Sequence, residues 1–189
     1  MGKHHYFIAL AFSEEEKKKI AEKAEHLAIQ HLFKKWVHTE DYHVTLAFLG
    51  DAERDGLDLL MNQIEQKLQR EESFPLLLTH FETFGRNERP RIFFIAPEKE
   101  EMLDAVQAIV AGCCRMAGFH LDEKPFNPHI TIARNYIGET NFTEEQLSEY
   151  SHSLGEGLGI KAKKLCLYET HIDATPKYRA IRAIFLQGN

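Results

Sequence analysis

Two short stretches decide how this chain folds: HVTLAFLG at residues 43–50 and HITIAR at residues 129–134. Both run histidine, apolar residue, threonine, apolar residue, alanine. Successive side chains of a β-strand point to opposite faces, so residues i and i+2 share a face. The alternation of polar and apolar residues therefore predicts two half-buried strands that each carry a histidine and a threonine on one face.

Strict alternation divides each stretch into a polar face and an apolar face. The polar face holds His43, Thr45 and Ala47 in the first stretch, and His129, Thr131 and Ala133 in the second. The apolar residues between them are expected to face the core. We therefore expect the two imidazoles and two hydroxyls to meet in a cleft with room for a ligand.

The surroundings of the two stretches repeat as well. Ile8 precedes His43 by 35 residues, and Ile95 precedes His129 by 34. Leu77 then follows His43 by 34 residues, and Leu165 follows His129 by 36. Self-similarity at one spacing indicates repeated supersecondary units. We predict a single domain over 1–189 made of two pseudo-repeats, at about 1–88 and 89–189.

Each repeat is predicted to run strand, helix, histidine strand, helix, strand. A capping box, Ser13 with Glu16, opens a helix that we extend to about Phe33, and Thr143 is the N-cap of a later short helix. Strands are expected at 5–12, 35–38, 74–84, 91–96, 163–170 and 178–186, and further helices at about 54–70 and 97–117. The predicted class is α+β, with two pseudo-symmetric lobes, each an antiparallel sheet with helices packed outside, enclosing a central cleft.

Composition limits the class of protein. The chain is 43% hydrophobic and 28% charged, with a formal net charge of −6 at pH 7. The sequence shows no basic stripe of the kind that binds long nucleic acid, so we expect any RNA partner to be bound only at its end or as a nucleotide. The three cysteines form no CxxC, and the apolar run near the N-terminus is too short to span a membrane. We expect a soluble, cytoplasmic monomer with no obligate protein partner.

The doubled His-x-Thr pattern suits phosphoryl chemistry. Imidazole titrates near neutrality, so one ring can accept a proton while the other donates one. The hydroxyls of Thr45 and Thr131 can hydrogen-bond the phosphoryl oxygens on which charge develops. No carboxylate or cysteine recurs with the pattern, so we expect no metal, no cofactor and no covalent nucleophile.

Arg134 and Phe48 occupy equivalent places in the two stretches, five residues after each histidine. An odd offset points both away from the cleft under strict alternation, although a bulge near a strand end can redirect a side chain. The Arg134 guanidinium could clamp a phosphate. Phe48 could stack on a base or simply pack in the core.

These residues resemble the paired His-x-Thr motifs of the two-histidine (2H) phosphoesterases, specifically the LigT-like branch of RNA 2′,3′-cyclic phosphodiesterases, also called 2′-5′ RNA ligases. The resemblance covers nearly the whole chain, including YFIALAF, RPRIFFIA and LYETHIDATPKYRAI. It departs at Asn127, where many relatives carry Arg, and at Thr170, where Ser is usual.

The resemblance implies metal-independent hydrolysis of an RNA terminal 2′,3′-cyclic phosphate to a 2′-phosphate. His43 would be the proton donor and His129 the proton acceptor, with Thr45, Thr131 and Arg134 on the phosphate and Phe48 against the base. The sequence alone does not decide which histidine is the acid. Three other functions stay open: a phosphodiesterase for another small nucleotide, such as ADP-ribose cyclic phosphate or 2′-5′ oligoadenylate; RNA ligation at the same site; and RNA or nucleotide binding without turnover.

Overall fold

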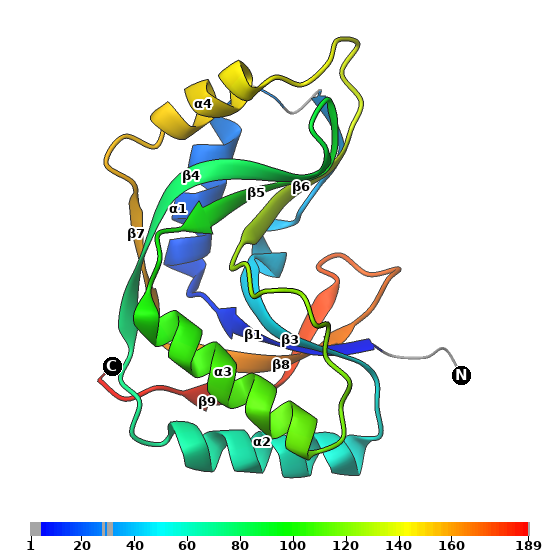
Figure 1. The fold of residues 1–189 in the computed structure, drawn as a ribbon, viewed down its shortest axis with the longest axis vertical. Coiled ribbons are helices and arrows are strands. Elements are labelled where there is room, and N and C mark those ends of the chain that lie inside the picture. Colours follow the sequence, from blue (N-terminus) through cyan, green and yellow to red (C-terminus); the bar gives the residue numbers. More distant parts are fainter. Residues whose placement is uncertain (1–4, 28, 30–31, 189) are drawn as a thin grey trace.

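A computed structural model describes residues 5–27, 29 and 32–188, which form two antiparallel sheets with helices around them (Figure 1). The strands are β1 (His5–Ala11), β2 (Phe33–Trp36), β3 (His43–Asp51), β4 (Phe74–Arg86), β5 (Arg89–Pro97), β6 (Ile130–Tyr136), β7 (Leu158–Ala162), β8 (Lys164–Thr170) and β9 (Tyr178–Phe185). The helices are α1 (Glu14–Glu25), α2 (Arg54–Leu68), α3 (Glu101–Met116) and α4 (Glu144–His152), with a 3₁₀ turn, η2 (Thr39–Asp41). The predicted α+β class with two antiparallel sheets is confirmed.

The two sheets do not coincide with the two sequence repeats. One sheet has the order β3-β1-β8-β9 and the other β2-β6-β5-β4-β7. Each histidine strand pairs with the opening strand of its own repeat, β3 with β1 and β6 with β5. The last strand of each repeat crosses over, because β8 pairs with β1 and β4 pairs with β5. Each sheet therefore contains strands from both halves of the chain.

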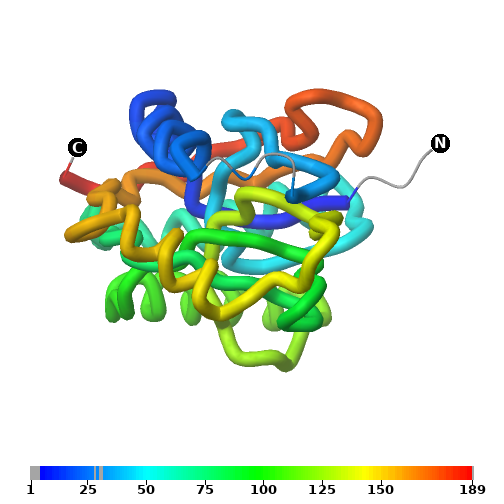
Figure 2. The backbone as a smooth tube through the Cα atoms, turned by 90° about the horizontal axis from the view of Figure 1, so that it is seen from above, coloured from blue at the N-terminus to red at the C-terminus, as the bar shows by residue number. Residues whose placement is uncertain are grey.

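Helices and loops cover the sheets from outside. Helices α2 and α3 pack against each other and α3 contacts β3, while α4 packs on β4 (Figure 1). One large apolar cluster joins both sheets, and Ile8, Leu60 and Ile95 in it are completely buried. The loop between β8 and β9 projects from the body in both views (Figures 1 and 2).

The local signals predicted most helix starts correctly. The predicted capping box of Ser13 with Glu16 is present at α1, and Thr143 is the N-cap of α4 as predicted, where Gln146 completes a second capping box. Gly118, just after α3, has φ 87°, a left-handed conformation that glycine adopts at little cost. The three cysteines are free and buried.

Three predictions of secondary structure were wrong. The helix predicted to open at Pro97 begins at Glu101, and Pro97 is the last residue of β5. Helix α1 ends at Glu25 rather than near Phe33, although residues 28, 30 and 31 of the predicted helix lie outside the described part. Phe33 instead opens β2, where its buried ring packs on Phe93 and Tyr136. Strand β7 was not expected from its glycine-rich sequence, and it forms because β4 offers it a partner edge.

Candidate active site

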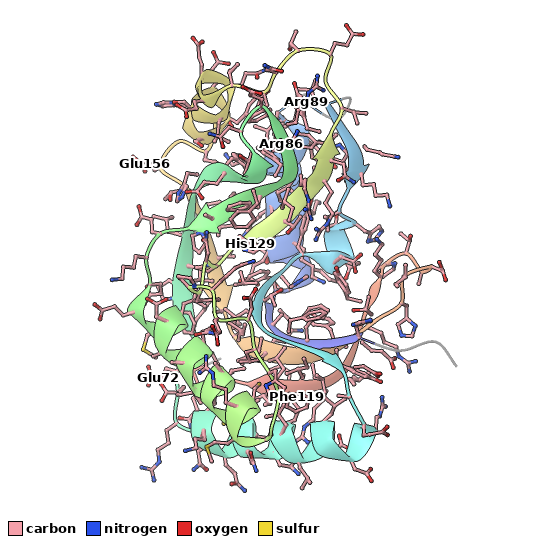
Figure 3. The ribbon with its side chains drawn as sticks, turned by 45° about the vertical axis from the view of Figure 1, so that its right-hand side comes forward. Glu72, Arg86, Arg89, Phe119, His129 and Glu156 are labelled. Carbon is pink, nitrogen blue, oxygen red and sulfur yellow. The ribbon has the colours of Figure 1, made fainter. Side chains whose placement is uncertain are left out.

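A central pocket of about 300 Å³ lies where the two histidine strands meet. Six of its lining side chains are those singled out from the sequence: His43, Thr45, Phe48, His129, Thr131 and Arg134. The first three come from β3 and the last two from β6, with His129 just before β6 near the centre of the molecule (Figure 3). The fold thus brings together residues that are far apart in the sequence.

A bulge at the same place in both strands explains why Phe48 and Arg134 reach the pocket. In the β1–β3 pair, Ala9 lies opposite Thr45 but Ile8 lies opposite Ala47, so Leu46 is the extra residue. An extra residue reverses the alternation beyond it. Phe48 therefore turns from the core side to the pocket side and is 56% exposed.

The second strand repeats this irregularity. Phe94 lies opposite Thr131 and Phe93 opposite Ala133, which makes Ile132 the extra residue and turns Arg134 toward the pocket. Strict alternation was wrong for Ala47 and Ala133, which are buried in the core instead of sharing the polar face. The strands otherwise follow the predicted pattern up to the bulge.

Both histidines are anchored in the same way. Nδ1 of His43 lies 2.7 Å from the main-chain oxygen of Asp41, and Nδ1 of His129 lies 2.8 Å from that of Asn127. A carbonyl oxygen only accepts, so each Nδ1 carries the proton and each neutral ring has its Nε2 as the acceptor. Nε2 of His43 is 3.1 Å from the Thr45 hydroxyl, which can donate to it.

Aromatic rings pack around His43 and partly shield it from water. The rings of Phe7, Tyr178 and Tyr168 have their centroids 4.9, 5.2 and 6.0 Å from that of His43. The pKa of His43 is lowered to about 4, chiefly by burial, which outweighs the opposing hydrogen bond and charge of Asp41, while electrostatic interactions with His129 and Arg134 add smaller lowering effects. The ring is therefore neutral at pH 7 in the free protein.

His129 has a similar but less enclosed environment. The rings of Phe84 and Phe94 both lie 5.0 Å from it, centroid to centroid. Burial lowers the pKa of His129, and the Arg134 charge lowers it further, while the hydrogen bond to Asn127 acts in the opposite direction. Two neutral imidazoles beside a guanidinium make a pocket suited to an anion flanked by proton carriers.

The sequence matches the family model described as the 2′-5′ RNA ligase superfamily over residues 16–173. The chain belongs to this superfamily.

Its relatives include a protein from Geobacillus stearothermophilus and one from Bacillus subtilis, both named RNA 2′,3′-cyclic phosphodiesterase. The first is 36% identical over 188 residues, which are all of this chain but only 59% of the relative's length. The second is 30% identical over 177 residues, covering 94% of this chain and 93% of the relative.

Solved structures share the fold. LigT from Escherichia coli, crystallised with 3′-AMP, superposes with a TM-score of 0.75 at 18% identity and covers 99% of this chain and 100% of its own. A protein from Thermus thermophilus superposes with a TM-score of 0.72 at 22% identity, over 98% of this chain and 99% of its own. The pairing of two sheets around a central pocket is thus the architecture of this 2′-5′ RNA ligase superfamily member.

Four other residues line the pocket of this superfamily member: His5, Phe7, Thr170 and Tyr178. Of these, only Thr170 was named from the sequence, as a departure from the family pattern. The four come from β1, the end of β8 and the start of β9. The His5 ring stacks near Phe48, with centroids 6.0 Å apart. Phe7 has a counterpart in the second repeat, because Phe94 packs on His129 as Phe7 packs on His43. Thr170 and Tyr178 have no such counterpart, and they reach the pocket because β8 pairs with β1 and β9 pairs with β8.

No group of three or more His, Cys, Asp or Glu side chains in residues 5–27, 29 and 32–188 is arranged to share a metal ion. Within the same ranges, no helix is both long and apolar enough to cross a membrane.

Proposed function

We propose that the chain hydrolyses the 2′,3′-cyclic phosphate at the 3′ end of RNA to a 2′-phosphate, using His43 and His129 as acid and base. The observation that carries this proposal is the matched anchoring of two imidazoles, each through Nδ1, on either side of one pocket that also holds Arg134. The names of the relatives at 36% and 30% identity support the choice of substrate.

The reaction needs one proton removed and one supplied. Nε2 of His129 takes a proton from water, whose oxygen attacks phosphorus, and the bond from phosphorus to O3′ breaks. His43 gives the proton of its Nε2 to the departing O3′, which leaves a 2′-phosphomonoester and a 3′-hydroxyl. Solvent exchange then returns a proton from His129 to His43. Arg134, Thr45 and Thr131 hold the phosphoryl oxygens on which charge accumulates.

The acid role of His43 depends on the substrate. With a pKa of about 4 in the free pocket, His43 lacks the proton that an acid must carry. An anionic phosphodiester between the rings favours the charged imidazolium and raises this pKa. Substrate binding therefore favours uptake of the proton that His43 gives to O3′. The assignment of the acid to His43 rests on the family resemblance.

The test is hydrolysis of an oligonucleotide that ends in a 2′,3′-cyclic phosphate, with products separated against 2′- and 3′-phosphate standards. We expect the 2′-phosphate, a loss of about 10²–10⁴-fold in kcat for His43→Ala and for His129→Ala, and full activity in EDTA. His26→Ala, at an exposed position after α1, is the control. Loss of turnover in EDTA, or near-normal rates in either single variant, would overturn the mechanism.

A substrate panel separates the competing activities. Preferred hydrolysis of ADP-ribose cyclic phosphate or 2′-5′ oligoadenylate would replace RNA as the substrate, and net formation of 2′-5′ bonds would indicate ligation. Binding of the cyclic-phosphate end without any turnover would leave only a binding module. The monomeric state and cytoplasmic location expected from the sequence remain parts of this proposal.

A further inference from the structure

A second, larger cavity opens directly from the central pocket. It has a volume of about 900 Å³ and shares Thr45, Phe48 and His129 with the pocket. We call it the α3 groove; its other walls come from β4, β5, α3 and the segment between α3 and His129, whose course from Phe119 to His129 is visible in Figure 3. A ligand in the pocket can therefore continue into the groove without leaving the protein surface.

The groove is positively charged on a negatively charged protein. Its lining includes the cations Arg91, Arg115 and Lys124 and one carboxylate, Asp122, whereas the whole chain has a net charge of −6. Lys124 lies 3.6 Å from Asp122, but both side chains are highly exposed, so this pair is weak. Arg91 and Arg115 are exposed and have no ion pair with another described residue. Both remain available to an anionic ligand.

Aromatic side chains lie where the central pocket meets the α3 groove and along the wall of the groove. Phe48 is exposed and lines both cavities, and Phe84 contacts His129 and also lines the groove. Gly85 lies opposite a bulge in β5, where Arg91 is the extra residue; its φ is 109°, and a Cβ there would lie 3.0 Å from the backbone nitrogen of Arg91. The bend that this glycine permits lets Phe84 and Arg91 line the same groove. A groove lined by both rings and cations suits the bases and phosphates of a single strand.

The chemistry of the substrate fixes which part of RNA can enter. A 2′,3′-cyclic phosphate uses both ribose oxygens of the last nucleotide, so the RNA can continue only through its 5′ oxygen. A pocket of about 300 Å³ lies at the small end of the roughly 300–1,000 Å³ typical of ligand sites, which leaves the preceding nucleotides for the groove.

We infer that the α3 groove binds the RNA strand on the 5′ side of the cyclic phosphate, with Arg91 and Arg115 on its phosphates, an inference that rests on the proposed function. A different cavity, of about 320 Å³, adjoins the other side of the pocket at Arg134 and Tyr178. It includes Lys35 and Lys177 but also the carboxylates of Asp41 and Asp173. The larger and more cationic α3 groove is the better path for a polyanion.

The experiment compares a nucleoside 2′,3′-cyclic monophosphate with a hexanucleotide that ends in the same group. The double variant Arg91→Gln/Arg115→Gln should lower kcat/KM for the hexanucleotide by about tenfold and reduce the slope of log(kcat/KM) against log(salt) by about 1.4, the value for two lost contacts to a single strand. The cyclic mononucleotide should change less than about twofold, because phosphates further along the strand are missing from it.

The matched control is Lys35→Gln/Lys177→Gln, which removes two charges from the smaller cavity. The inference is overturned if this control shows the hexanucleotide-specific loss, if Arg91→Gln/Arg115→Gln affects both substrates equally, or if it affects neither. If the wild type hydrolyses neither substrate, the proposed function fails. In that case, RNA binding by the α3 groove is tested without catalysis, by fluorescence anisotropy with a labelled hexanucleotide that ends in a 2′-phosphate. The inference then requires that the double variant bind this hexanucleotide about tenfold more weakly than the wild type.

Discussion

The main chain of Asp41 accepts the Nδ1 proton of His43 at 2.7 Å, and the side chain of the same Asp41 holds the strand that carries Tyr178. Its buried carboxylate accepts hydrogen bonds from the backbone N–H groups of Lys177, at 3.0 Å to each oxygen, and of Tyr178, at 3.1 Å. The Tyr178 ring in turn packs edge-on against His43. One residue thus fixes both the tautomer of His43 and a ring that shields it.

Asp41→Ala should therefore disturb stability and catalysis together. It leaves two backbone N–H groups without their acceptor, which costs about 1–3 kcal/mol in the free energy of unfolding. kcat should fall because the Tyr178 ring no longer holds His43 in place, while Asp41→Asn, which keeps one acceptor oxygen, should recover part of both. Urea denaturation and steady-state kinetics measure the two effects, with Asp173→Ala, on the loop between β8 and β9, as the control. Wild-type stability and kcat in Asp41→Ala would contradict this role.

The stability of the protein should fall with acidity because of His43. Its pKa is lowered from 6.5 to about 4, so below pH 6.5 the unfolded chain takes up a proton that the folded protein does not. Stability contributed by the neutral ring is complete above pH 6.5 and is lost as the pH falls to about 4, by up to about 3 kcal/mol. Urea titrations of wild type and His43→Gln across this range measure it. An unchanged pH slope in His43→Gln would show that the ring titrates normally.

Arg134 should set the position of the pH–rate profile. Its charge lowers the pKa of both His43 and His129, so Arg134→Gln should raise both values and move the whole bell-shaped profile of kcat/KM to higher pH. KM should also increase, because the phosphate loses a bidentate donor. Arg134→Lys keeps the charge and should keep the position of the profile while still raising KM. A profile that does not move in Arg134→Gln would rule out this electrostatic coupling.

Phe48 should contribute to substrate binding and not to stability. The side chain is 56% exposed at the junction of the pocket and the α3 groove. Phe48→Ala should raise KM for a cyclic-phosphate oligonucleotide by about tenfold, as expected for one lost base–ring stack, while Phe48→Trp should restore binding. Leu59→Ala, 65% exposed on α2, is the matched control. Equal KM values for Phe48→Ala and wild type would assign this ring no contact with the base.

The recurrence of the histidine stretches allowed much of the site to be predicted from the sequence. Period-two alternation in residues 43–50 and 129–134 predicts strands, and the recurrence selects two histidines out of eleven. Arg134 and Phe48 were harder, because the bulges at Leu46 and Ile132 are defined only by register with β1 and β5. A bulge belongs to a pair of strands, so the sequence of one strand does not determine it.

The amino-acid sequence by itself determined the two His-x-Thr strands, the N-caps Ser13 and Thr143 and the order of every strand except β7, because these depend on neighbours within a few residues. Only the tertiary structure decided that β8 joins the sheet of β1 and β3 while β4 joins the sheet of β5 and β6. This pairing brings Thr170 and Tyr178 to a pocket built from β3 and β6. The tertiary structure also decided that carbonyls of Asp41 and Asn127 fix the imidazole tautomers and that exposed cations line one groove. These features depend on which distant segments pack together, and that choice is made by burial of the whole core.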